Sequence, residues 1–132
     1  MNLSHVAAVA LGAIVLAVGP AQATGRPDRS LTAEGRGVAV EFFRSQNERR
    51  YDDTCRLFSS GFYRSHGLRD ERTCAAVLRV TFVWNGRIEF RVGDVTREAD
   101  RVVVSAVADG APGRIVLVRE DGALRILALE EG

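Results

Sequence analysis

The hydrophobic period of this chain changes once, and that change constrains the fold more than any other feature. Up to about Phe82, apolar residues recur at spacings of three and four, as they do along one face of an α-helix. After Trp84-Asn85-Gly86, they alternate with polar residues or form short β-branched runs between turn sequences. Helices followed by strands predict an α+β domain, with N-terminal helices packed on one face of an antiparallel sheet.

Two helices are predicted in the first half of this domain. Apolar residues at helical spacing indicate a first helix over residues 32–50, and a second is expected over 54–59. Asp52 or Asp53 can serve as the N-cap of the second helix. The same two carboxylates could instead bind a cation, but an adjacent pair lacks the six or more oxygen ligands that calcium takes. Capping is therefore the favoured interpretation.

A loop and a third helix come next. Residues 59–68 are rich in Gly and Ser and include aromatic residues, which is typical of a loop that buries some of its side chains. Asp70 is a plausible cap for the third helix. Cys74 lies on the apolar face of that helix, where it could meet Cys55 if the second and third helices pack side by side.

Four strands are predicted after Gly86. They cover residues 88–92, 102–107, 115–118 and 124–128. The connections between them are short and contain Asp, Glu, Gly or Ala, as hairpin turns do. This pattern predicts an antiparallel meander.

The first 23 residues have the layout of a signal peptide. They contain no Lys, Arg, Asp or Glu, and their apolar run from Val6 to Val18 is shorter than the roughly 20 residues of a membrane-spanning helix. Ala21-Gln22-Ala23 fits the small-residue pattern of a cleavage site, so we expect removal before Thr24. An uncleaved anchor is the less favoured alternative.

The remaining chain is expected to be one exported domain. Residues 24–30 are polar and contain Gly and Pro, which favours a disordered lead-in, and a single α+β domain is expected over 31–130. The export signal predicts a secreted or cell-envelope protein with no membrane attachment after cleavage. Whether that location is periplasmic or extracellular stays open.

Charge is balanced along the chain. The 18 basic residues, all of them Arg, are matched by 17 acidic residues for a formal net charge of +1. Nucleic-acid binding would call for a basic patch or stripe, and the Arg residues are scattered instead. GC-rich coding in a bacterial genome explains the exclusive use of Arg more simply than a cluster of guanidinium groups that grips an anion.

Two cysteines, Cys55 and Cys74, lie in the predicted helices. In an exported small domain, an even number of cysteines favours a disulfide. This bridge would close a loop of about 20 residues and contribute roughly 3 kcal/mol to stability. The spacing does not fit a C-x-x-C redox motif, and no His or carboxylate partners suggest a metal site, so no metal or cofactor is expected.

The order of these elements resembles the nuclear transport factor 2-like superfamily, the cone-shaped α+β fold shared with ketosteroid isomerase. The resemblance lies in Val38-x-x-x-Phe42-Phe43, Arg50-Tyr51-Asp52, Thr73-Cys74-Ala75-Ala76 and the tail from Ile115 to Ile126. The chain is especially similar to small exported bacterial members in which two helix cysteines are expected to pair. The fold often has five or six strands, so an early strand is either missing or lies within residues 61–68.

The resemblance implies a fold that hosts isomerases, dehydratases, transport adaptors and scaffolds alike. Its enzymes place carboxylates, Tyr or His inside the cone. The predicted strands offer few such groups, because Glu89 and Arg91 occupy the face that suits solvent. Tyr63 and His66 are the remaining candidates for a pocket mouth, with Trp84 closing its apolar side. The alternatives are a surface position for His66 and packing at the domain rim for the two rings.

Three functional hypotheses follow. The favoured one is a non-enzymatic exported domain that binds a small apolar ligand or a protein partner, because the strands are hydrophobic and carry few inward polar groups. The second is an isomerase or dehydratase-type enzyme that uses His66, Asp52 or Asp94 in the cone. The third is a homodimer through the exposed sheet face, suggested by apolar residues on both faces of residues 102–107.

Overall fold

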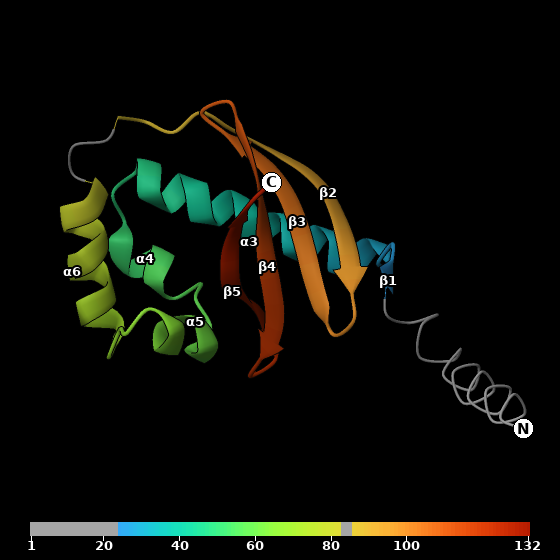
Figure 1. The fold of residues 1–132 in the computed structure, drawn as a ribbon, viewed down its shortest axis with the longest axis horizontal. Coiled ribbons are helices and arrows are strands. Elements are labelled where there is room, and N and C mark those ends of the chain that lie inside the picture. Colours follow the sequence, from blue (N-terminus) through green and yellow to red (C-terminus); the bar gives the residue numbers. More distant parts are fainter. Residues whose placement is uncertain (1–23, 83–85) are drawn as a thin grey trace, which may run out of the picture.

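The helices precede a four-stranded meander, as the spacing of apolar residues predicts, and one short additional strand comes before the helices (Figure 1). The computed structural model describes residues 24–82 and 86–132, so the predicted signal peptide over 1–23 lies outside the described residues. The elements are β1 (Thr24–Gly25), α3 (Arg29–Asn47), α4 (Tyr51–Cys55), α5 (Ser60–Ser65), α6 (Glu71–Phe82), β2 (Phe90–Glu98), β3 (Arg101–Ala108), β4 (Ala111–Glu120) and β5 (Ala123–Glu131). Among the described residues, no helix is long and apolar enough to span a membrane.

The strands form one antiparallel sheet in the order β1-β2-β3-β4-β5. The meander of β2 to β5 confirms the predicted topology. The additional strand is β1, which pairs Thr24 with Glu98, and residues 61–68 contribute no strand. The structure therefore differs from the disordered lead-in expected for residues 24–30.

Helix α3 lies across the curved sheet, and α4, α5 and α6 gather at one end of it (Figure 1). The helix begins at Arg29 because Asp28 caps it: the Asp28 carboxylate accepts the Leu31 N–H at 2.7 Å. Gly35 is buried where α3 meets the sheet, and a Cβ there would lie 3.4 Å from Val95 and Val102. A side chain longer than that of alanine at this position would separate the helix from the sheet.

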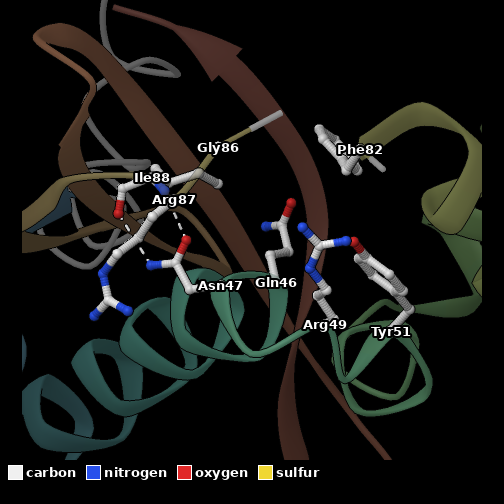
Figure 2. Close-up of a pocket in the computed structure, with 8 residues that line it drawn as sticks. All are labelled: Gln46, Asn47, Arg49, Tyr51, Phe82, Gly86, Arg87 and Ile88. Carbon is white, nitrogen blue, oxygen red and sulfur yellow. Dashed lines mark hydrogen bonds between the residues drawn. The ribbon is translucent and has the colours of Figure 1, made fainter. Parts of the chain in front are cut away.

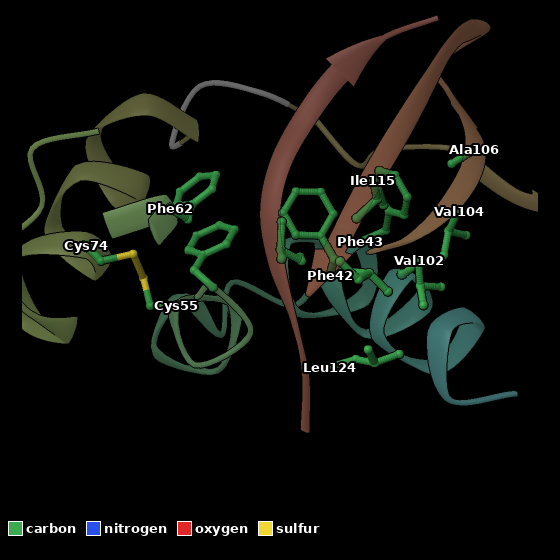
Figure 3. Packing of buried hydrophobic residues seen from close by; sticks show 14 of the residues in the cluster. Phe42, Phe43, Cys55, Phe62, Cys74, Val102, Val104, Ala106, Ile115 and Leu124 are labelled. Atoms are coloured by element: carbon green, nitrogen blue, oxygen red, sulfur yellow. A yellow bond between two sulfur atoms is a disulfide. The ribbon is translucent and has the colours of Figure 1, made fainter. Parts of the chain in front are cut away.

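The core lies between α3 and the inner face of the sheet (Figure 3). Val104, Leu117 and Ile126 are fully buried at its centre, on β3, β4 and β5. A chain of contacting aromatic rings crosses the core in the order Phe90, Phe43, Phe42, Phe58 and Phe62. These rings extend the core from β2 to α5, at the end of the sheet where the short helices gather.

Helix α4 differs from its predicted position. It spans Tyr51–Cys55 instead of 54–59, so Asp52 and Asp53 lie in its first turn and do not cap it. The Asp53 carboxylate instead pairs with Arg50 at 2.6 Å and with Arg56 at 2.7 Å. Acidic groups in a first turn are favourable because the N-terminal end of a helix carries partial positive charge.

The predicted loop over 59–68 contains helix α5. Ser59 caps this helix by accepting the Phe62 N–H at 3.1 Å. The Glu120 carboxylate, on β4, accepts the Ser60 N–H at 3.1 Å and the Ser60 hydroxyl at 2.7 Å. Contacts from a distant strand thus complete a helix that is too short to be stable alone.

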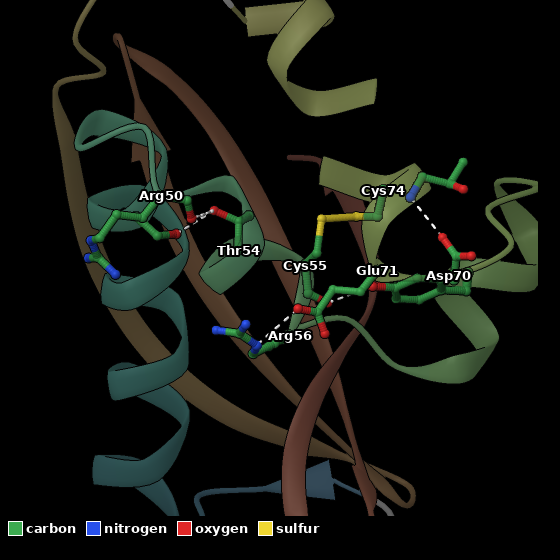
Figure 4. The surroundings of a disulfide bond; sticks show 10 residues. Arg50, Thr54, Cys55, Arg56, Asp70, Glu71 and Cys74 are labelled. Carbon is green, nitrogen blue, oxygen red and sulfur yellow. Dashed lines mark hydrogen bonds and ion pairs between the residues drawn. A yellow bond between two sulfur atoms is a disulfide. The ribbon is translucent and has the colours of Figure 1, made fainter. Parts of the chain in front are cut away.

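The predicted disulfide is confirmed. Cys55 of α4 is bonded to Cys74 of α6, with the two Cα atoms 6.0 Å apart (Figure 4). An ion pair between Arg56 and Glu71 at 3.0 Å lies beside it. Asp70 caps α6 as expected, because its carboxylate accepts the Thr73 N–H at 2.8 Å. Disulfides persist in oxidising compartments.

The outer face of the sheet has a few apolar side chains at its centre, with charged side chains around them. Val103 and Val116 are paired across β3 and β4, and both are buried although they lie outside the core cluster. Arg114 extends over this face and pairs with Glu98 at 3.1 Å and Glu130 at 3.3 Å. A homodimer through this face stays a prediction.

Glu34 of α3 links the helix to the hairpin between β4 and β5. Its carboxylate accepts hydrogen bonds from the Arg119 guanidinium at 3.0 and 3.1 Å and from the Leu124 N–H at 3.2 Å. The bond from Arg119, followed by the one from Leu124, lowers the pKa of Glu34 below its ordinary value of 4.5 despite some desolvation. The ionised form is therefore the one that stabilises the fold.

This pKa shift predicts a loss of stability in acid. A carboxyl group whose pKa is lower when folded stabilises the protein above its unfolded pKa, and that contribution disappears as the pH falls through the folded pKa. We expect urea unfolding to show a larger loss of stability between pH 6 and pH 3 in the wild type than in Glu34→Gln. Glu131→Gln, a change at an exposed residue, is the control and should match the wild type. Equal losses in the wild type and Glu34→Gln would contradict this role.

Candidate functional site

An apolar groove of about 280 Å³ lies between α6 and the neighbouring end of the core. Phe42 of α3, Phe62 of α5 and Leu129 of β5 line one side of it, together with Phe58. Phe58 is held beside the sheet because Ser59 donates its N–H to the Ile126 carbonyl at 2.8 Å. Three parts of the chain, namely α3, the segment of Phe58 and Phe62, and β5, therefore build this side of the groove.

Helix α6 forms the other side. Val77, Leu78 and Phe82 line the groove from this helix, along with Cys74. Among the residues of α6, only Cys74 and Ala75 are buried, so this helix is attached to the domain over a small area. The disulfide to α4 thus secures one side of the groove.

The groove leaves large apolar side chains in contact with water. Val77 is 46% exposed and Leu129 is 45% exposed. Removing apolar surface from water is worth about 25 cal/mol for each Å². A ligand that covers these two side chains would gain that energy, whereas the empty groove does not.

Three polar side chains lie among the apolar ones. They are Gln46 of α3, His66 at the end of α5 and Thr81 of α6. Cys74 is held in the disulfide, so His66 is the titratable side chain among the described residues that line the groove. Its ring stacks on Phe62 with a centroid distance of 4.0 Å, which continues the aromatic chain of the core to the groove.

The structure separates two of the three residues that the sequence proposes as a pocket. His66 lines the groove, but Tyr63 is turned elsewhere, and its hydroxyl donates to the Cys55 carbonyl at 3.0 Å. Burial, followed by the charges of Glu71 and Asp70, raises the pKa of Tyr63 above its usual value. Tyr63 is therefore a neutral link between α5 and α4. Trp84 lies outside the described residues.

The carboxylates proposed for acid-base chemistry lie away from the groove. Asp52 and Asp94 are both exposed, and neither lines the groove. General acid-base catalysis needs a group within hydrogen-bond reach of the reacting atoms. Within the described part of the chain, His66 is thus left without a carboxylate partner in the groove.

A second, more polar pocket of about 170 Å³ adjoins the groove (Figure 2). Gln46 and Phe82 line both spaces, and Arg49 and Tyr51 line the polar pocket alone. Asn47 closes one side of this pocket through two hydrogen bonds to the Ile88 backbone, at 2.7 and 3.0 Å. These bonds occupy the Asn47 amide and leave Gln46 as the polar group shared by the two spaces.

The geometry agrees with a known architecture. No family model matches this chain, and no curated protein matches its sequence. The structure of Aln2 from a Streptomyces species is similar, with a TM-score of 0.55 and 13% identity over 80% of this chain and 94% of that one. The fold is nuclear transport factor 2-like. At this level of identity the likeness concerns the fold alone.

Two further solved structures are more distant. Bd1075 from Bdellovibrio bacteriovorus has a TM-score of 0.49 at 10% identity, over 71% of this chain and 38% of that one. A protein from Kribbella flavida, assigned by name to the ketosteroid isomerases, has a TM-score of 0.40 at 19% identity. That match covers 72% of this chain and 76% of the other.

Sequence reasoning missed most of the groove in this nuclear transport factor 2-like fold. Phe42 and Leu129 are far apart in the chain, and each suits an ordinary core position. One signal was available, because Phe58, Phe62 and His66 are spaced four residues apart. Residues at this spacing lie on one face of a helix, and Tyr63, next to Phe62 in the chain, does not belong to that set.

Proposed function

We propose that this protein is an exported, non-enzymatic binding protein that holds a small apolar molecule in the groove between α5, α6 and β5. The observation that carries the proposal is the groove itself, which is lined by aromatic and aliphatic side chains from four parts of the chain. Ligand sites are typically concave and apolar with a few polar groups. The disulfide supports an oxidising location, as the predicted signal peptide over 1–23 does.

The size of the groove limits the ligand. Typical pockets for small molecules measure about 300–1,000 Å³, so about 280 Å³ suits a compound with one ring or a short chain. The exposed parts of Val77 and Leu129 would be covered by such a compound. Burial of about 100 Å² of apolar surface would contribute roughly 2.5 kcal/mol to binding.

The enzyme alternative has less support. An isomerase or dehydratase needs a proton acceptor and a group that stabilises developing charge. Among the described residues, the groove offers His66 with Gln46 and Thr81, and no carboxylate. A protein that only binds its ligand needs neither a proton acceptor nor a group that stabilises developing charge.

Arginine substitutions at two valines of α6 test the proposal. Val77 lines the groove, whereas Val80 is 73% exposed on the same helix and lies outside it. The probe is para-butylanisole, a neutral apolar compound, and NMR titration of backbone amides measures its affinity. We expect Val77→Arg to weaken binding by about tenfold or more, because a guanidinium in the groove displaces apolar contacts and resists desolvation.

The control is Val80→Arg, which adds the same charge to the same helix and should bind the probe as the wild type does. In the wild type, amide shifts should centre on α5, α6 and the end of β5. Equal weakening in both variants would indicate a general effect of charge. Wild-type protein that does not bind the probe, or shifts confined to another face, would overturn the proposed function.

A further inference from the structure

The polar atoms of the groove indicate what kind of apolar molecule it takes. Polar groups at such sites fix the orientation of a ligand, because each needs a complementary partner once water is excluded. The three polar side chains differ in what they have left to offer. Their other hydrogen bonds decide whether each can act as a donor or as an acceptor.

His66 offers an acceptor. Its Nδ1 lies 3.0 Å from the Phe62 carbonyl oxygen and 3.0 Å from the Ser65 hydroxyl. A carbonyl oxygen can only accept, and the Ser65 hydroxyl donates to that same oxygen at 3.0 Å. Nδ1 must therefore carry the proton. An unprotonated Nδ1 would place its lone pair against a lone pair of the carbonyl oxygen, and the two would repel each other. In the neutral ring, Nε2 is then the acceptor that remains for a ligand.

Gln46 offers a second acceptor. Its side-chain nitrogen donates to the Phe42 carbonyl at 3.1 Å, which assigns the orientation of the amide. Its Oε1 accepts no hydrogen bond from the residues that the structure describes. Figure 2 shows Gln46 beside Asn47 and Arg49, among the residues that line the polar pocket. Thr81 adds a hydroxyl, which can donate or accept.

We infer that the groove selects neutral apolar compounds that carry a hydroxyl or N–H donor, such as phenols or alcohols, over carboxylates and over compounds without a donor. This inference rests on the proposed function. His66 and Gln46 supply acceptors, and no Arg or Lys lines the groove among the described residues. A carboxylate would face these lone pairs without a cation, and its desolvation would be costly.

The neighbouring polar pocket offers a site that would favour carboxylates instead. Arg49 lines that pocket, which shares Gln46 and Phe82 with the groove. A carboxylate long enough to pass these two residues would reach a guanidinium. The experiment must therefore compare a donor with an acid on the same apolar body.

Three probes with one apolar body make this comparison: para-butylphenol, para-butylanisole and para-butylbenzoate. Affinities are measured by NMR titration at pH 8. We expect the phenol to bind about two- to tenfold more tightly than the anisole, the range that one net hydrogen bond supports, and the benzoate to bind most weakly.

His66→Phe assigns the preference to the imidazole. Phenylalanine keeps a ring to stack on Phe62 and removes the acceptor, so the phenol should fall to the affinity of the anisole while the anisole is unchanged. Tyr63→Phe is the matched control. It removes a polar atom three residues earlier that does not line the groove, and it should leave the preference intact.

The outcomes separate this inference from the proposed function. Equal wild-type affinities for all three probes would overturn the donor preference and leave the apolar binding site standing. Tightest binding of the benzoate would also overturn the preference and would direct attention to Arg49. A preference for the phenol that persists in His66→Phe would show that the imidazole does not provide it. No binding of any probe would overturn both proposals.

Discussion

Replacing both Cys55 and Cys74 with alanine should lower the free energy of unfolding by about 3 kcal/mol. The bridge joins residues 19 positions apart, and closing a loop of this size restricts the unfolded chain by that amount. For a domain of this size, the melting temperature should fall by roughly 10 °C or more. Calorimetry and urea unfolding of the double variant measure both quantities.

The same double variant should bind ligands less tightly. Helix α6 buries little besides Cys74 and Ala75, so loss of the bridge releases one side of the groove. The control is Arg56→Gln, which removes the exposed ion pair to Glu71 beside the bridge and should cost less than about 1 kcal/mol. A double variant with wild-type stability and wild-type probe affinity would show that packing alone holds α6.

Leu117→Ala should destabilise the domain by about 2–5 kcal/mol. Leu117 is fully buried on β4, opposite Val102 of β3 and Ile126 of β5. Its removal leaves a cavity that neighbouring strands cannot fill without breaking the sheet register, so both the transfer energy and packing contacts are lost. Urea unfolding followed by circular dichroism measures the change.

Two further variants keep this prediction testable if Leu117→Ala does not fold. Ile126→Val removes one methylene from an equally buried site and should cost about 0.5–1.5 kcal/mol. Val80→Ala removes apolar atoms from a side chain that is 73% exposed and should stay within about 0.5 kcal/mol of the wild type. Similar costs for Ile126→Val and Val80→Ala would contradict the position of the core.

The two strongest predictions concern different parts of the domain. Leu117 stabilises the sheet and α3, whereas the disulfide secures α6 and one side of the groove. A reduced protein that keeps its sheet but loses probe binding would fit this division. Binding measurements on the proposed function should therefore be made on oxidised protein, with the free thiol content checked.

Much of the fold could be predicted because it depends on local sequence patterns. The change of period places the helices before the strands, and short acidic and Gly-containing connections specify hairpins between β2 and β5. Asp70 caps α6 through an N–H only three residues away. The pairing of Cys55 with Cys74 needed only an even cysteine count and two helices with apolar faces.

Other features depend on contacts between distant residues. Residues 59–68 resemble a loop locally, and α5 forms there because Glu120 and the edge of β5 bind its first residues. Residues 24–25 have no apolar pattern and gain strand structure by pairing with β2. Short elements of this kind are too weakly favoured alone to be recognised from propensity.

The sequence by itself determined the α+β class, the antiparallel meander and the disulfide, because periodicity, turn residues and cysteine spacing act within a few residues of one another. Only the tertiary structure decided the groove. Its sides come from α3, α5, α6 and β5, and packing turned His66 towards the groove and Tyr63 towards Cys55. Whether a side chain faces the core or the groove depends on which elements meet, and that is set by burial over the whole chain.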